Sequence, residues 1–147
     1  MIAKGRDAER LLQTPPADIR VWLLHGANRG GVRERADRLA AGWVERPDDP
    51  FDTALLTEAD LSDDPARLSD ELAALSMLGG RRLVRLRLTG EKIGPERTAA
   101  EAVTAHAEGR LNPEALFVIE AGALAGSSGL RKAAEGAKAG AVSIAVY

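Results

Sequence analysis

The sequence contains no cysteine, and aromatic residues make up only 3% of its 147 positions. Without cysteine there can be neither a disulfide framework nor a thiolate metal site. The two histidines, His25 and His106, lie far apart in the sequence, so a zinc site is not expected either. The scarcity of aromatic residues also argues against a surface that binds nucleic acid by stacking bases.

Long runs of one kind of residue are absent as well. No stretch reaches the roughly 18 apolar residues that a membrane span needs, and residues 1–6 lack the apolar core of a signal peptide. The formal net charge is only −2, so the overall field does not indicate a nucleic-acid or membrane partner. We therefore expect a cytoplasmic protein with no membrane contact. A chain of 147 residues with 45% hydrophobic content suits one globular domain over residues 1–147.

The most informative stretch begins with four apolar residues at 21–24 and continues into a glycine-rich turn. Apolar residues then recur at helical spacing, at Val32, Ala36, Leu39, Ala40 and Trp43. This pattern predicts a buried strand, a tight loop and an amphipathic helix, which is the arrangement of a phosphate loop.

The chemistry of a phosphate loop is nevertheless missing. Gly26 and Gly31 stand at the phosphate-loop interval, but Val32 and Arg33 occupy the positions that require Lys and Ser or Thr. Those residues would supply the main cation and a magnesium ligand, so we expect a degenerate loop that neither binds nor hydrolyses nucleotide. Backbone amides near Arg29 and Arg33 leave weak anion binding open.

Apolar segments and helical patterns alternate along the rest of the chain. Strands are expected at residues 21–24, 53–57, 81–88, 115–120 and 141–146, and helices at residues 4–13, 32–43, 64–75, 94–106 and 128–137. This order predicts an α/β fold with a parallel five-stranded sheet and helices on both faces. Because the chain stops directly after a core strand, we expect a domain cut from a longer protein.

The helix expected at residues 64–75 leads to a second candidate site. Asp64 can cap it and Pro65 is tolerated in its first turn, while Gly79 and Gly80 are expected to end it. Its buried stripe is expected to contain Leu68, Leu72 and Leu75.

Met77 and Leu78 would then be turned away from that stripe. Two interpretations remain open for this pair. It closes the helix end by an internal contact, or it forms a hydrophobic plug for a pocket on another protein. Burying both side chains would contribute on the order of 3–6 kcal/mol before association costs.

The densest basic patch lies just after this pair, at Arg81, Arg82, Arg85 and Arg87. Alternation in the strand places Arg85 and Arg87 on one face and Val84, Leu86 and Leu88 on the other. A solvated or ion-paired face is favoured for the arginines, and contact with a protein or nucleic-acid partner stays open.

Other chemistry-bearing residues have simpler interpretations. Glu120 ends a strand where an active ring-forming ATPase would carry an Asp-Glu pair, and a lone carboxylate there favours a cap or an ion pair. Ser127 or Ser128 is expected to cap a helix, and His25 to bond to backbone at its strand end. The acidic residues lack calcium-loop spacing and are expected on a solvated surface: Glu58, Asp60, Asp63, Asp64, Asp70 and Glu71.

The order and spacing of these features resemble one known family, the N-terminal domain of the delta subunit of the bacterial DNA polymerase III clamp loader. The resemblance rests on residues 19–39, on Asp49-Pro50-Phe51, on residues 64–87 with 75–82 at their centre, and on residues 116–120 followed by Leu130-Arg131-Lys132. It implies an AAA+-like P-loop NTPase fold with a degenerate nucleotide site. It also implies a role in DNA replication without intrinsic catalysis, in a subunit of a DNA-directed DNA polymerase holoenzyme. No cofactor is implied.

The resemblance further implies a site and partners. The domain would bind and open the sliding clamp, the beta subunit, through Ser76, Met77 and Leu78, with Gly79, Arg81 and Arg82 as candidate supporting contacts. The family commonly has leucine then phenylalanine where this chain has Met77 and Leu78. The family's lid and collar domains are absent from this chain, and the collar joins the other loader subunits, gamma/tau and delta prime. DNA contact through that assembly stays open. The alternative function is a divergent nucleotide-binding hydrolase or switch that uses the Gly26 to Gly31 loop.

Overall fold

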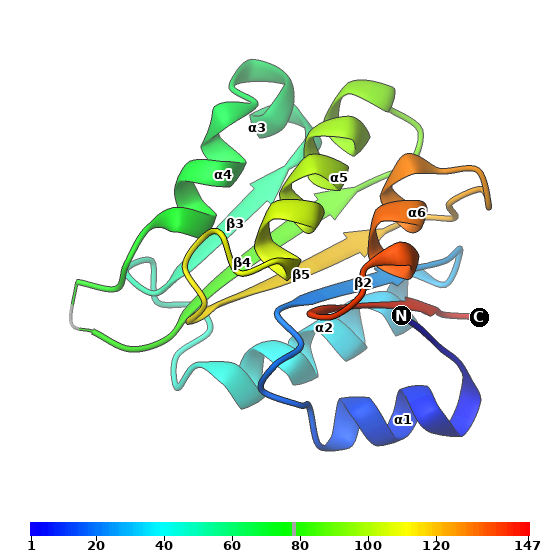
Figure 1. The fold of residues 1–147 in the computed structure, drawn as a ribbon, viewed down its shortest axis with the longest axis horizontal. Helices are drawn as coiled ribbons and strands as arrows, with labels where there is room; N and C mark the ends of the chain where they lie inside the picture. The colour runs from blue at the N-terminus through cyan, green and yellow to red at the C-terminus, as the bar shows by residue number, and fades with distance from the viewer. Residues whose placement is uncertain (78) are drawn as a thin grey trace.

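The computed structural model describes residues 1–77 and 79–147, so Leu78 lies outside the described residues. Within them the chain forms a parallel six-stranded sheet in the order β1-β6-β2-β5-β4-β3 (Figure 1). The strands are β1 (Ile2–Ala3), β2 (Val21–His25), β3 (Thr53–Thr57), β4 (Arg82–Leu88), β5 (Ala115–Ala121) and β6 (Ala141–Ala145). All strands run the same way, so the sheet has a carboxyl edge where they end and an amino edge where they begin.

The sheet has one strand more than the sequence predicts. The additional strand, β1, pairs with β6 through Ile2 and Ala3. The backbone N–H of Ser143 also donates to the Met1 carbonyl at 2.8 Å. A strand of two residues has no periodicity to detect, which is why the sequence predicts only the other five.

Helices cover both faces of the sheet, as expected (Figure 1). On one face lie α1 (Gly5–Gln13) and α2 (Arg29–Trp43), and on the other lie α3 (Glu58–Asp63), α4 (Ala66–Ala73), α5 (Ile93–Ala107) and α6 (Gly129–Gly136). The short helix α1 packs beside α2.

Two hydrophobic clusters fill the space between the sheet and its helices. In β2, Leu23 faces the cluster under α3 to α6, while Trp22 and Leu24 face the cluster under α1 and α2. All five residues of β2 and all seven of β5 are buried. Continuous burial on both faces is typical of central parallel strands and explains their unbroken apolar runs.

The helix expected at residues 64–75 is different in the structure. Asp64 is the C-cap of α3, Pro65 is the N-cap of α4 without a side-chain hydrogen bond, and α4 ends at Ala73. The carbonyls of Leu72 and Ala74 accept hydrogen bonds from the backbone and side chain of Asn112, at 3.1 and 2.9 Å. A distant residue therefore contacts the helix end, which comes well before the predicted stop at Gly79 and Gly80.

This early end also overturns the prediction for Leu75. Its side chain is 76% exposed and does not continue the buried stripe of Leu68 and Leu72. The backbone at Ala74 is already extended, with φ −65° and ψ 141°, so helical spacing no longer applies to residue 75.

The turn that follows β2 depends on a glycine. Gly26 has φ +151°, and a Cβ atom there would lie 2.0 Å from the Val146 carbonyl oxygen. That chain segment is held close because the Val146 N–H donates to the His25 carbonyl at 2.7 Å.

No described helix is long and apolar enough to cross a lipid bilayer.

Alanine substitutions at two glycines, one in this turn and one in the helix after it, should have opposite effects on stability. Gly26→Ala should lower the free energy of unfolding by about 2 kcal/mol or more, because the new methyl group overlaps the backbone of Val146. Gly30→Ala should raise it by about 0.5–1 kcal/mol, because Gly30 lies in α2 and its nearest neighbour is 3.9 Å away. Urea unfolding measures both, and equal stabilities for the two variants would contradict the turn geometry.

Candidate functional site

The glycine loop lies at the carboxyl edge of the sheet, between β2 and α2. Asn28 is the N-cap of α2, and its side-chain oxygen accepts a hydrogen bond from the Gly31 N–H at 3.0 Å. Its amide nitrogen donates to the Tyr147 carbonyl at 3.1 Å. The Gly26 N–H donates to the carbonyls of Ala121 and Gly122. Two of the backbone amides that could cradle a phosphate thus already have partners in the chain.

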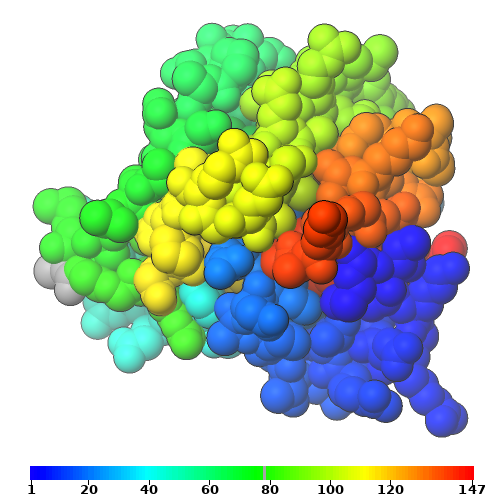
Figure 2. Space-filling view, in the orientation of Figure 1, coloured from blue at the N-terminus to red at the C-terminus, as the bar shows by residue number. Residues whose placement is uncertain are grey.

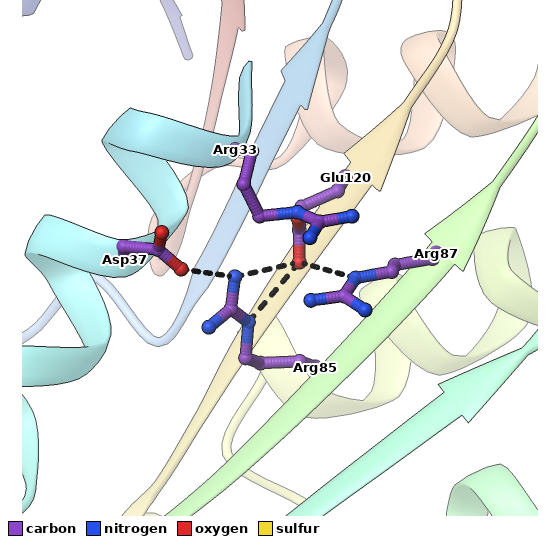
Figure 3. Close-up of polar contacts among 5 residues, drawn as sticks. All are labelled: Arg33, Asp37, Arg85, Arg87 and Glu120. Atoms are coloured by element: carbon purple, nitrogen blue, oxygen red, sulfur yellow. Dashed lines mark hydrogen bonds and ion pairs between the residues drawn. The ribbon is translucent and has the colours of Figure 1, made fainter. Parts of the chain in front are cut away.

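A cluster of charged side chains lies beside this loop, centred on the buried carboxylate of Glu120 (Figure 3). One carboxylate oxygen accepts from Arg33 Nε at 2.7 Å. The other accepts from Arg85 Nε at 3.1 Å and lies 3.0 Å from Arg85 Nη2 and 3.5 Å from Arg87 Nε. Asp37 also accepts from Arg85 Nη2, at 2.9 Å.

The contacts in this cluster show whether Glu120 is free, as an ATPase would require, or serves as a cap or an ion-pair partner. Both oxygens of its carboxylate are already bonded to arginines, so it is an ion-pair partner, as the sequence favours. Charge-assisted bonds of this kind are stronger than neutral ones, and the carboxylate would have to break them to bind a metal ion or activate water.

The remaining arginines of the basic patch lie at the other end of β4. Arg82 is buried and forms an ion pair with Glu71 at 3.7 Å. Arg81 lies at the surface with its guanidinium carbon 4.2 Å from the centre of the Trp43 ring, a cation–π contact. Of the two favoured outcomes, a solvated or an ion-paired face, the structure shows a largely ion-paired one, and Arg85 is buried within it.

Three smaller predictions have mixed outcomes. Ser128 caps α6 as predicted, accepting from the Arg131 N–H at 3.2 Å. Glu58, expected on a solvated surface, is buried and accepts from the Thr89 N–H and hydroxyl. His25, expected to bond to backbone, is paired with the Ser143 hydroxyl at 3.2 Å. Each missed partner lies in another strand or loop, so local sequence gave no signal for it.

The second candidate site is the 74–81 loop, whose described residues, 74–77 and 79–81, lie at the amino edge of the sheet. It precedes β4, and its Ser76 hydroxyl donates to Asp52 Oδ1 at 2.8 Å, which ties it to the turn before β3. Three large apolar side chains are exposed in these two segments: Met77 (82%), Leu75 (76%) and Phe51 (64%). Figures 1 and 2 show the segments together at one end of the molecule, where the chain after α4 protrudes.

The two candidate sites are therefore separated by the length of the sheet. β4 connects them and has seven residues, which corresponds to roughly 20 Å at about 3.3 Å per residue. The sequence leaves the exposure of Met77 open and gives no sign that Phe51 and Leu75 are exposed as well. Leu78, the other half of the predicted pair, lies outside the described residues.

An α/β fold with a parallel sheet, a glycine turn after β2 and a helix starting at that turn has the architecture of a P-loop NTPase. The structure is similar to the DNA clamp loader delta protein of Bacillus subtilis, with a TM-score of 0.68 and 20% identity over 95% of this chain and 41% of that one. It is also similar to a DNA polymerase III gamma subunit-related protein of Thermotoga maritima, with a TM-score of 0.59 and 13% identity over 95% of this chain and 44% of that one.

In its fold the chain is a clamp-loader-like domain, and it spans about two fifths of the length of these structures. The expected α/β fold with a parallel sheet and helices on both faces is confirmed, with six strands in place of five. No family model matches the sequence, and no curated protein matches it.

Removing the charge of Glu120 should destabilise the domain strongly. Glu120→Ala should lower the free energy of unfolding by about 3–5 kcal/mol, because it leaves Arg33, Arg85 and Arg87 without their common partner. The control is Glu34→Ala, whose exposed pairs with Arg35 and Arg38 should contribute no more than about 1 kcal/mol. Equal losses of stability for Glu120→Ala and Glu34→Ala in urea unfolding would contradict the prediction.

The buried histidines predict a loss of stability in mild acid. Burial is the main cause that lowers the pKa of His25 and of His106 below the ordinary 6.5, and nearby Arg131 and Arg20 add to it. Below about pH 6.5 the unfolded chain therefore binds more protons than the native one. As the pH is lowered, the free energy of unfolding decreases by up to about 1.4 kcal/mol per pH unit for each histidine.

Urea unfolding between about pH 7 and pH 5.5 measures this slope. In the variant His25→Gln the slope should be smaller, because one of the two groups is gone. Stability that stays constant or rises over this range would contradict the prediction.

Proposed function

We propose that this chain is the clamp-binding and clamp-opening domain of a delta-type clamp loader subunit, which acts in DNA replication without an ATPase activity of its own. The observation that carries the proposal is that Met77 is 82% exposed. Leu75 in the same loop and Phe51 in the turn before β3 are exposed as well. The fold likeness to the delta protein of Bacillus subtilis supports it.

The 74–81 loop has the physical properties of a docking element. Exposed large apolar side chains that gather at one place are typical of protein interaction surfaces. Methionine is flexible enough to fill an irregular pocket, and its burial would supply about 1.5–3 kcal/mol. The bond from Ser76 to Asp52 holds the loop against the turn that carries Phe51, which reduces the entropy lost on binding.

Met77 and Leu78 are the proposed plug, with Ser76 as the residue that positions it. Leu78 enters by its place in the sequence alone. Among the supporting residues, Arg81 has its guanidinium at the surface beside Trp43, and Gly79 has φ +77°, which allows the tight turn after the plug. Arg82 is buried against Glu71, so its contribution would be to hold β4 in place rather than to touch the clamp.

The proposed lack of catalysis rests on two features of the carboxyl edge. Val32 and Arg33 stand where a phosphate loop needs Lys and Ser or Thr, and the carboxylate of Glu120 is bonded to arginines. The alternative, nucleotide binding at the Gly26 to Gly31 loop, predicts magnesium-dependent binding of ATP in the micromolar range. Calorimetry with ATP and magnesium tests it, and such binding would replace the present proposal.

The proposed partners are the sliding clamp, the beta subunit, and in a longer protein the gamma/tau and delta prime subunits. In that setting this domain would supply the contact with the clamp, and further chain would join the other subunits. DNA would be reached through the assembly rather than through Arg85, whose guanidinium group is buried and bonded to Glu120 and Asp37.

The double variant Met77→Ala with Leu78→Ala should weaken binding to a bacterial sliding clamp at least tenfold. Removing both apolar side chains deletes the surface that the clamp pocket would bury, and a tenfold loss corresponds to about 1.4 kcal/mol. A binding titration by calorimetry or surface plasmon resonance measures the effect. Ser76→Ala should weaken binding less, because it loosens the loop without removing contact area.

The control is Ile93→Ala, since Ile93 is 73% exposed at the start of α5 and lies toward the carboxyl edge. It should bind the clamp like the parent chain. Unchanged affinity in the double variant, with thermal unfolding also unchanged, would rule out this plug.

A further inference from the structure

A cavity of about 390 Å³ opens beside the charged cluster at the carboxyl edge of the sheet. Its walls come from the first two turns of α2, the ends of β4 and β5, and the segments that follow β3 and β4. The glycine loop itself, residues 26–28 and 30–31, is not part of the lining. The cavity has the size of a small-ligand pocket and adjoins the phosphate-loop position, because Val32 and Arg33 are among its lining residues.

Positive charge dominates the lining. The cationic side chains are Arg29, Arg33, Arg87 and Lys92, against the two carboxylates of Glu58 and Glu120. Four cations against two carboxylates leave an excess of two positive charges. The floor is apolar, with the buried side chains of Val32 and Leu88, and an apolar floor strengthens electrostatic attraction in the pocket.

The carboxylates of this pocket are already engaged within the chain. Glu120 is bonded to Arg33 and Arg85, and Glu58 accepts from the N–H and hydroxyl of Thr89. Among the described residues, Arg29 and Lys92 form no ion pair within 4.0 Å. Their charges are the ones left to attract an incoming group.

Arg87 provides a third, independent indication. Its Nε atom is buried, and its 3.5 Å contact with Glu120 lacks hydrogen-bond geometry, so within the described part of the chain this donor has no hydrogen-bond partner. A buried donor without an acceptor costs free energy that a bound or rearranged acceptor would recover. Arg87 also lines the cavity.

We propose that this pocket binds the phosphate or polyphosphate group of a small molecule through Arg29, Arg87 and Lys92, without a metal ion. Guanidinium groups match phosphate oxygens with paired N–H donors, and a lysine adds a compact charge. The excess of two positive charges matches a phosphate dianion. The site is independent of the proposed clamp contact, which lies at the opposite edge of the sheet.

The test uses sodium tripolyphosphate and inorganic phosphate as probes, without divalent metal, in calorimetry at low salt. Tripolyphosphate should bind with a Kd below about 1 mM, and its affinity should fall as the salt concentration rises. The variant Arg29→Gln with Lys92→Gln should lose at least tenfold in affinity. Each single variant should lose less than the double variant.

The matched control is Lys4→Gln with Lys138→Gln, which removes the same charge from two exposed lysines that do not line the cavity. It should bind tripolyphosphate like the parent chain. Equal losses in both double variants, binding of a short DNA duplex without binding of tripolyphosphate, or no binding up to about 10 mM would each overturn the proposal. Clamp binding should be unchanged in the Arg29 and Lys92 variants, so failure of one proposal leaves the other standing.

Discussion

The bonds that Glu120 makes with its arginines join α2 to the centre of the sheet. The carboxylate projects from β5, its partner Arg33 comes from α2, and Arg85 and Arg87 come from β4. A buried carboxylate is tolerated only where charged donors compensate for its lost hydration. Here they do so while holding α2 against the strands, so the helix that begins at the glycine loop cannot shift without breaking charge-assisted bonds.

The same cluster changes what the carboxyl edge can do. A phosphate-loop enzyme keeps free carboxylates there to hold magnesium and position water. In this chain the carboxylate at the end of β5 is neutralised, and excess positive charge faces the neighbouring cavity. The proposed anion site rests on this excess of positive charge and would need no metal ion.

In the described part of the chain, the amino edge of the sheet has exposed apolar side chains and a hydrogen bond between segments in place of an ion-pair cluster. The described residues of the 74–81 loop form no charged cluster of comparable size, and the bond from Ser76 to Asp52 holds the loop to the turn before β3. Its exposed apolar side chains and the ion-paired carboxyl edge are separated by the rigid strands between them. The parallel sheet, buried on both faces, thus keeps the two surfaces apart by the length of its strands.

The sequence by itself determined five of the six strands and the helices that connect them except α3, because each depends on periodicity in the chain. The absence of Lys and of Ser or Thr after Gly31 is likewise plain from the sequence alone. The sequence also offered an exposed Met77 as one of two interpretations and a cap at Ser127 or Ser128. Only the tertiary structure decided that Asn112 would bond to the end of α4, that Leu75 would be exposed, and that Glu58 would be buried. These outcomes depend on partners far away in the sequence, and a local pattern contains no information about which distant groups the fold brings together.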